Sequence, residues 1–470
     1  MADLDAVVAR VADRVTPSPA ERDRLQAAVD DLRDRIRAAA ADLPVDADVV
    51  QVGSTARETW LADDRDIDLF VRFPSDVDRA DLERYGLAVG RAVLPDGREE
   101  YAEHPYVAGE FDGFDVDLVP CYDVPAATDI RSAVDRTPFH DAYLQARLTS
   151  DLARSVRVCK AFLSGIGAYG SNLRTRGFSG YLTELLVLEH GGFVPLVRAA
   201  ADWHPPVRFD PEDHGTRSFD DPLVMFDPTD PERNVAAVCS AENVARFQHY
   251  ARVLLADPSE SVFESADPDP LSPADVCAHL DRRGTTPVAV VFERPTLVDD
   301  QLYPQLRKSL RGVADELDRR GFSPLRSATL AADDADRAAL FLELEVAELP
   351  AVTRHGGPPV HVREHATGFY ETYAGVSASD GDDAADADRS GDAPDVYGPF
   401  LADDRYVVER DREFRTARAF LAGDALFDVA LGAHVETALE DGYDLLVGDE
   451  VATLAESFGV ELARYFRPRP

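Results

Sequence analysis

The sequence predicts a multidomain α+β protein, in which an α/β region is followed by a helical region, a small α/β domain and a mixed C-terminal tail. Before residue 150, short runs alternate apolar with acidic residues as strands do, whereas from about 151 to 256 apolar residues recur at helical spacing. A stretch rich in Pro, Ser and acidic residues, 258–273, separates these regions from the remainder. At 470 residues, the chain has room for roughly three domains, each with its own core.

The N-terminal region is expected to open with a helix and a short strand. Ser18-Pro19-Ala20-Glu21 combines an N-cap serine, a proline in the first turn and the glutamate of a capping box, so a helix should run to about Ala41. Ala47–Val52 predicts a strand, and Gly53-Ser54 ends it directly before Thr55-Ala56-Arg57, which favours a helix start. Glycine lets the backbone approach a ligand closely, and the Ser54 hydroxyl with the N–H groups that follow offers donors to phosphate oxygens.

Two aspartate-bearing strands follow. Asp66-Ile67-Asp68 alternates carboxylates with apolar residues, so it predicts a strand with both carboxylates on one face. Phe114–Pro120 alternates in the same way, and Asp112-Gly113 signals a hairpin turn that joins it to a strand at Tyr106–Phe111. We therefore expect the two aspartate-bearing strands to lie side by side.

Three carboxylates that converge on one point would suit Mg²⁺, which takes oxygen ligands and keeps waters and substrate phosphates in its shell. Asp66 and Asp68 are two candidates, and Asp115 or Asp117 is the third. Two such ions can activate an attacking hydroxyl and stabilise the leaving oxygen of an in-line displacement. An Asp-x-Asp pair by itself favours a solvated strand edge in so acidic a chain. The preceding order of strand, Gly-Ser and helix favours phosphoryl or nucleotidyl transfer instead.

Five motifs carry a family resemblance: Val52-Gly53-Ser54, Thr59-Trp60-Leu61, Asp66-Ile67-Asp68-Leu69-Phe70, Val116-Asp117-Leu118-Val119-Pro120-Cys121-Tyr122, and Asp227-Pro228 with Arg233-Asn234-Val235-Ala236. On these motifs, nearly the whole chain resembles the archaeal, class I CCA-adding enzymes of the nucleotidyltransferase superfamily. The resemblance implies a polymerase-β-like catalytic domain. It also implies Mg²⁺-dependent addition of C, C and A to tRNA from CTP and ATP, without a nucleic-acid template.

The resemblance also implies roles for individual residues. Asp66, Asp68 and Asp117 match the metal ligands, although relatives often have Glu at the first position, and Asp115 shares a face with Asp117. Those that match the nucleotide-binding residues are Ser54, Arg57, His140, Lys160 and Tyr169 for the triphosphate, and Arg233 for the edge of the incoming base.

The residue types themselves support these roles unequally. Lys160 is one of two lysines among 49 basic side chains, and a compact ammonium is not freely replaced by arginine in a triphosphate clamp. His140 could equally cap or pack, and Tyr169 in its loop is ordinarily a packing residue. Arg233 follows Asp230-Pro231, which predicts a helix start where an exposed arginine is commonplace.

The formal net charge of −39 is the opposite of that of an ordinary nucleic-acid binder. An acidic, lysine-poor chain is typical of a salt-rich cytosol, so we expect a halophilic archaeal source. Binding to RNA at high salt must depend on shape, stacking, metal bridges and local arginines. Candidate patches, each of which is individually more consistent with a solvated helix face, are Arg174-Thr175-Arg176, Arg307-Lys308 with Arg311, Arg319-Arg320, and Arg464-Tyr465-Phe466-Arg467-Pro468-Arg469.

The expected domains are a catalytic domain at 1–150, a helical domain that closes over the nucleotide at 151–257, a small RRM-like α/β domain that handles RNA at 274–350, and a tail at 351–470. In the third, Pro287–Phe292, Ser323–Leu330 and Ala338–Ala347 predict strands, and Leu302–Arg320 predicts a helix. In the tail, Asp411–Ala422 and Glu450–Tyr465 predict helices, and the acidic run 377–394 predicts a disordered loop.

The remaining expectations concern setting and rival functions. Cys121, Cys159, Cys239 and Cys277 form no Cys-x-x-Cys pair, and neither a signal peptide nor an apolar span is apparent, so we expect a cytoplasmic protein without a zinc site or disulfides. A homodimer is plausible by resemblance. A poly(A)-type polymerase would share the catalytic pattern, and a catalytically silent RNA-binding scaffold would carry these carboxylates as halophilic surface.

Overall fold

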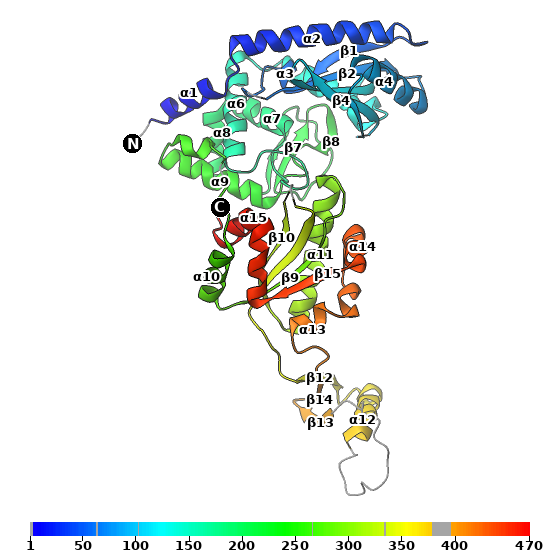
Figure 1. Cartoon of the computed structure of the whole chain (residues 1–470), viewed down its shortest axis with the longest axis vertical. Coiled ribbons are helices and arrows are strands. Elements are labelled where there is room, and N and C mark those ends of the chain that lie inside the picture. Colours follow the sequence, from blue (N-terminus) through cyan, green and yellow to red (C-terminus); the bar gives the residue numbers. More distant parts are fainter. Residues whose placement is uncertain (1–2, 63, 102, 266, 333–334, 378–395) are drawn as a thin grey trace. The chain divides into compact units, whose positions relative to one another are not determined.

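The computed structural model describes residues 3–62, 64–101, 103–265, 267–332, 335–377 and 396–470, with the backbone alone at 375–377. The chain divides into two compact units, Met1–Ala266 with Pro470, and Asp267–Arg469, so the division lies within the predicted linker 258–273 (Figure 1). The finer division into four domains stays a prediction. Each unit has its own buried apolar clusters.

The first part of the N-terminal unit is a mixed sheet covered by helices. Its strands have the order β1-β2-β5-β4-β3, in which β2 and β5 are parallel and the other pairs are antiparallel. The elements are α1 (Leu4–Val15), α2 (Pro19–Ala40), β1 (Asp48–Val52), α3 (Gly53–Ala56), β2 (Asp66–Pro74), α4 (Arg79–Val93), β3 (Arg98–Tyr101), β4 (Pro105–Phe111) and β5 (Phe114–Asp123).

Local signals account for several of these boundaries. The Ser18 hydroxyl accepts from the Glu21 N–H at 3.2 Å, and the Glu21 carboxylate accepts from the Ser18 N–H at 2.7 Å, so the predicted capping box of α2 is confirmed. Asp112 and Gly113 have φ of 50° and 78°, the left-handed values of a two-residue hairpin turn between β4 and β5. The predicted strands and hairpin are therefore confirmed.

The sheet separates an apolar face from a carboxylate face. Ile67 and Leu69 of β2 and Val116 of β5 lie in the core with residues of α2 and α4. Because side chains alternate across a strand, Asp66, Asp68 and Asp117 project from the opposite face.

The second part of the N-terminal unit is mainly helical around an aromatic core that includes Phe162, Phe193 and Phe247. The prediction of helix throughout 151–256 is incomplete, because a small sheet of order β6-β7-β8 interrupts the helices. The elements are η1 (Ala127–Asp129), η2 (Ala133–Arg136), α5 (Thr137–Gln145), α6 (Ser150–Gly165), α7 (Gly180–His190), α8 (Phe193–Ala201), β6 (Val207–Phe209), β7 (Leu223–Asp227), β8 (Asp230–Asn234), α9 (Ala241–Ala256) and η3 (Glu260–Phe263).

One expected helix start in this part is wrong. Asp230-Pro231 begins strand β8, because the chain turns back at Thr229 and β8 pairs with the fully buried strand β7. The Asp227 carboxylate accepts from the Thr229 N–H at 2.9 Å and so holds this turn. Tertiary pairing thus overrides the local helix signal.

The second unit contains a βαββαβ sandwich, in which the strands and helix predicted within 274–350 are joined by a strand from the predicted tail, Tyr443–Val447. Its sheet is antiparallel with the order β10-β11-β9-β15, and apolar clusters line both faces, one with α11 and the other with α10 and α15. The elements are α10 (Pro273–Arg283), β9 (Thr286–Glu293), α11 (Asp299–Arg320), β10 (Pro324–Ala331), β11 (Arg337–Leu344), α13 (Ala417–Leu421), η5 (Asp424–Asp428), α14 (Ala433–Asp441), β15 (Tyr443–Val447), η6 (Gly448–Leu454) and α15 (Ala455–Phe466).

Between β11 and α13 the chain forms a small sheet of order β12-β14-β13 with a helix, from β12 (Val352–Pro359), α12 (Arg363–Ser377), β13 (Val396–Ala402) and β14 (Arg405–Asp411). The predicted helix Asp411–Ala422 is mostly wrong, because Arg412 and Arg415 pair through their backbones with Ala351 and Leu349. The predicted helix Glu450–Tyr465 begins instead at Ala455, after a 3₁₀ turn. The predicted acidic loop lies outside the described residues from 378 onward.

Candidate active site

The predicted carboxylates lie on two neighbouring parallel strands. Asp66 of β2 is opposite Asp115 of β5, and Asp68 is opposite Asp117. Adjacent strands are about 4.8 Å apart, so the four carboxylates form one acidic group on the face away from the core. Asp115 is exposed, whereas Asp117 is partly buried beside Asp68.

The protonation of this group reflects burial and mutual repulsion. Burial, followed by the charges of Asp117 and Asp66, raises the pKa of Asp68 to about 7. Burial and neighbouring carboxylates likewise raise the pKa of Asp66 to about 6, and burial and Glu100 raise the pKa of Asp117. Carboxylates held together in this way are stabilised by a divalent cation, which removes the repulsion.

The group has the donor chemistry of a magnesium site, but its geometry is open. Among the described residues, no three His, Cys, Asp or Glu side chains already converge as metal ligands do. Asp66, Asp68 and Asp117 would therefore turn toward a shared ion from the positions that the strand register gives them.

Gly53 makes room for Asp68. Its φ of +80° is in the left-handed region, and a Cβ atom at this position would lie 2.2 Å from Asp68 Oδ2. The chain then enters the short helix α3, whose second residue is Ser54. Glycine is thus required here twice, for the backbone conformation and for the close approach, and Ser54 follows directly at the acidic group.

Arg57 is held in a buried ion-pair network. Its Nη2 donates to Glu184 Oε2 at 2.8 Å, its Nη1 pairs with Asp141, and Glu184 also accepts from the Thr59 hydroxyl. The Arg57 side chain is 8% exposed and that of Glu184 is fully buried. Burial alone would lower the pKa of Arg57, but the two carboxylates outweigh it and raise the pKa. The network joins the loop after α3 to helices α5 and α7.

Lys160 and Tyr169 meet at the beginning of α7. A Cβ atom on Gly180 would lie 3.2 Å from Tyr169 Oη and 4.0 Å from Lys160 Cε, so the glycine leaves space between these groups. Lys160 is 3% exposed, and its burial lowers the pKa of the ammonium while Glu184 opposes that effect. A buried ammonium at this place is suited to an anionic ligand such as a phosphate.

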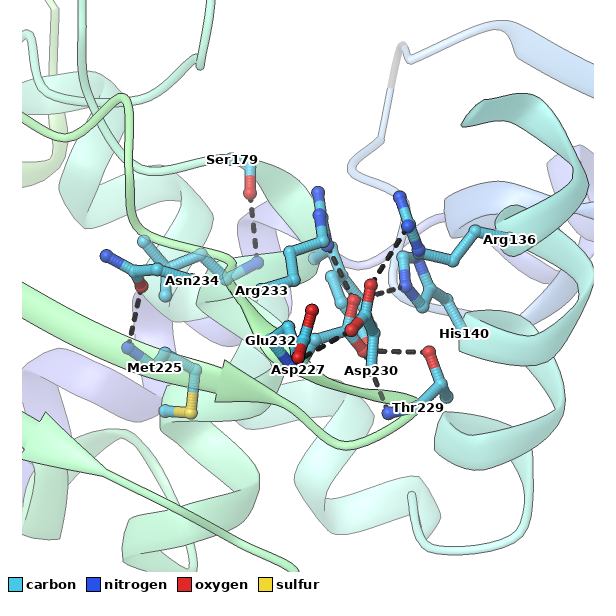
Figure 2. A network of polar contacts seen from close by, with 12 residues as sticks. Arg136, His140, Ser179, Met225, Asp227, Thr229, Asp230, Glu232, Arg233 and Asn234 are labelled. Atoms are coloured by element: carbon cyan, nitrogen blue, oxygen red, sulfur yellow. Dashed lines mark hydrogen bonds and ion pairs between the residues drawn. The ribbon is translucent and has the colours of Figure 1, made fainter. Parts of the chain in front are cut away.

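His140 and Arg233 converge on Asp227 (Figure 2). His140 Nε2 lies 2.8 Å from Asp227 Oδ2, and Arg233 Nη1 lies 2.6 Å from the same oxygen. The His140 ring stacks on Tyr181 with centroids 4.0 Å apart. Burial lowers the pKa of His140, although its hydrogen bond to Asp227 opposes this effect. The two residues, which come from α5 and β8, are therefore neighbours.

Several of these partners were missed by the sequence analysis. Glu184 had a usable signal, because it is the one charged residue in the apolar run Tyr181–Leu188. Asp227 was part of a family motif but had no expected role, and Asp141 in α5 had no signal at all. The acidic group thus lies within reach of the charge of Arg57, and a cation beside carboxylates that can hold a metal is what a metal-bound nucleoside triphosphate requires.

Comparisons with known proteins agree with this chemistry. Family models match residues 33–140 as a nucleotidyltransferase domain, 154–264 as the second domain of tRNA nucleotidyltransferase, and 283–448 as the C-terminal domain of the CCA-adding enzyme. No described helix has the length and apolar composition to cross a membrane.

Similar whole proteins come from halophilic archaea and are named CCA-adding enzyme. The protein of Halorubrum lacusprofundi is 65% identical over 478 residues, covering 100% of both chains. That of Haloarcula marismortui is 59% identical over 480 residues, covering 100% of this chain and 99% of its own. That of Halobacterium salinarum is 58% identical over 472 residues, covering 100% of both. A solved cytoplasmic RNA terminal U-transferase is more distant, with 17% identity and a TM-score of 0.43 over 57% of this chain and 99% of its own.

Proposed function

Because this chain belongs to the CCA-adding enzyme family, we propose that it adds C, C and A to the 3′ end of tRNA from CTP and ATP, without a nucleic-acid template. The observation that carries the proposal is the register of β2 against β5, in which Asp68 is opposite Asp117. Such a pair of carboxylate strands beside Gly53-Ser54 is the arrangement that nucleotidyl transfer needs.

We assign Asp66, Asp68 and Asp117 to Mg²⁺. The assignment is supported by burial, together with the charges of neighbouring carboxylates, which raises the pKa of all three carboxyl groups. Divalent ions held there would lower the pKa of the terminal ribose hydroxyl and neutralise charge on the α-phosphate. Asp115 is the alternative to Asp117, but it is opposite Asp66 and more exposed.

The remaining site residues would hold the nucleotide. Lys160 and Tyr169 would bind the triphosphate together with Ser54, and pyrophosphate would leave toward Ser54, Arg57 and Lys160. Arg57 would contact the triphosphate while it stays paired with Asp141 and Glu184. Its charge already offsets part of the rise in the pKa of the neighbouring Asp68. His140 would contact the triphosphate, and Arg233 would read the edge of the base.

The test is an extension assay in molar KCl with Mg²⁺, using a tRNA without its 3′ CCA and labelled CTP or ATP, separately and together. Products are resolved at single-nucleotide length. Growth by two C and one A, followed by arrest, is expected. Long A tails would reassign the protein as a polymerase, and a lack of extension at every salt concentration would favour an RNA-binding scaffold.

A matched pair of variants tests the metal assignment. Asp117→Asn should abolish extension, because a carboxamide is a poor Mg²⁺ ligand. Asp115→Asn removes the same charge from the same strand face and should leave most of the activity. If the two effects were reversed, Asp115 would be the ligand.

The setting of the reaction is part of the proposal. We place the protein in the cytoplasm of a halophile, with tRNA, CTP and ATP as its partners. A homodimer is proposed on the resemblance alone, and light scattering in molar KCl tests it by giving twice or once the chain mass.

A further inference from the structure

Asp227 is a buried carboxylate that accepts hydrogen bonds from several elements at once. It ends strand β7, in which every residue is buried, and it has no exposed surface. Its Oδ1 accepts from the Thr229 N–H at 2.9 Å, from the Thr229 hydroxyl at 2.8 Å and from the Tyr181 hydroxyl at 3.3 Å. Its Oδ2 is shared by His140 and Arg233 (Figure 2). Every oxygen lone pair of this carboxylate thus has a nearby donor.

These contacts keep Asp227 ionised. Burial alone would raise the pKa of its carboxyl group, but the hydrogen bonds from His140 and Thr229 and the charge of Arg233 outweigh burial and lower the pKa below its usual range. Since an ionised carboxylate can only accept, the proton of a neutral His140 must lie on Nε2. The nitrogen left for a ligand is therefore Nδ1.

The same carboxylate also orients Arg233. Its Nη1 lies 2.6 Å from Asp227 Oδ2, whereas 36% of the side chain is exposed, so part of Arg233 remains accessible to a ligand. A guanidinium is rigid and planar, so fixing one nitrogen and the plane directs the remaining donors. Because Arg233 and His140 contact the same oxygen of Asp227, a shift of either residue changes the hydrogen bonding of the other.

We propose that Asp227 is a positioning residue that couples the base-reading Arg233 to the triphosphate-binding His140, so that base selection and triphosphate placement depend on one buried carboxylate. The inference rests on the proposed function, which supplies the roles of Arg233 and His140. A nucleotide with the wrong base displaces Arg233, and through Asp227 it also displaces the His140 contact. Selection against it then acts on kcat as well as on KM.

The main test is Asp227→Asn, which keeps the size of the side chain. It replaces one acceptor oxygen by an NH2 group, which cannot accept the hydrogen bonds that Arg233 and His140 donate. Extension of tRNA is measured with CTP, ATP, UTP and GTP in molar KCl. The ratio of kcat/KM for CTP over UTP should fall at least about tenfold, the usual effect of losing a hydrogen bond to a charged group. The matched control Glu232→Gln removes one exposed charge in strand β8 and should keep the wild-type ratio.

A second measurement reports on the contact between His140 and the triphosphate. Inorganic pyrophosphate has no base, so its inhibition constant reports the triphosphate contacts alone. Pyrophosphate inhibition should weaken in Asp227→Asn and in His140→Ala, and to a smaller extent in Arg233→Ala, because Arg233 acts on His140 through Asp227. An unchanged inhibition constant in Arg233→Ala would oppose the coupling. In the double variant Asp227→Asn/Arg233→Ala, the CTP/UTP ratio should be no lower than in Arg233→Ala, because Asp227 acts on the base through Arg233.

The proposal would be overturned if Asp227→Asn lowered kcat/KM for all four nucleotides equally, or if its effect multiplied with that of Arg233→Ala. Should Asp227→Asn fail to fold, as judged by circular dichroism, Thr229→Val replaces it. That variant removes the 2.8 Å hydroxyl contact while keeping the carboxylate, and a smaller fall in the same ratio is expected; an unchanged ratio opposes the proposal. Equilibrium binding of the four nucleotides is measured in parallel. If the wild type binds CTP selectively without extending tRNA, the proposed function fails while the role of Asp227 is still decided by this binding ratio.

Discussion

Glu184→Gln is the perturbation for which the structure allows the sharpest prediction on stability. Glu184 is fully buried and accepts from Arg57 Nη2 at 2.8 Å, from Arg57 Nε at 3.2 Å and from the Thr59 hydroxyl. Glutamine has the same volume, so the substitution removes charge without opening a cavity. Arg57 would keep one charged partner, Asp141.

The expected loss is about 3 kcal/mol, the lower end of the cost of removing one partner from a buried ion pair, since Asp141 still compensates part of the Arg57 charge. The buried network is shielded from salt, whereas exposed pairs are screened within about 3 Å at 1 M salt. The loss in the free energy of unfolding should therefore be the same at low and at high KCl concentration.

The assay is urea unfolding at constant KCl, followed by tryptophan fluorescence. Both tryptophans of the chain, Trp60 and Trp203, are buried in the N-terminal unit, so the signal reports the unit that contains Glu184. Glu189→Gln is the matched control, since Glu189 is exposed on the same helix, α7. A loss for Glu184→Gln no larger than that of Glu189→Gln would refute the reasoning.

Three further predictions concern the acidic group. Gly53→Ala should lower the free energy of unfolding by about 1–3 kcal/mol, because alanine is strained in the left-handed backbone conformation of Gly53. It should also abolish extension, because the new Cβ would lie 2.2 Å from Asp68 Oδ2. The control Gly191→Ala, at φ +72° with no atom within 4 Å of the new Cβ, should cost as much stability but retain activity. The raised pKa of Asp68, about 7, and of Asp66, about 6, means that the folded protein favours their protonated forms. In EDTA, the stability of the fold should therefore fall as the pH rises from the ordinary carboxyl range to about 7, and then level off. Melting curves of the wild type and of Asp68→Asn at several pH values check this, since the variant should lose much of the pH dependence. Mg²⁺ binding should weaken as the pH falls below about 7, which calorimetric titration at pH 6 and pH 8 measures; equal affinities at the two pH values would contradict the assignment.

The sequence already indicated much of the acidic half of the site. The alternation around Asp66 and Asp68, the Asp112-Gly113 turn and the Ser18 capping box are local signals that depend on residues within a few positions of one another. Local signals failed where pairing across the fold competed with them. Asp230-Pro231 lies in a strand because it pairs with β7. Residues 411–416 are not helical because their backbone pairs with 348–351.

The sequence by itself determined which strands carry the carboxylates and which face they share, because strand periodicity is a property of neighbouring residues. Only the tertiary structure decided what the cationic residues contact. Arg57 meets Glu184 across 127 positions, and His140 meets Asp227 across 87. No periodicity links residues so far apart. Their contact follows from how α5, α7 and β7 pack. Burial then makes the charges of Arg57 and Glu184 require each other, and it makes the Asp227 carboxylate require the hydrogen bond from His140.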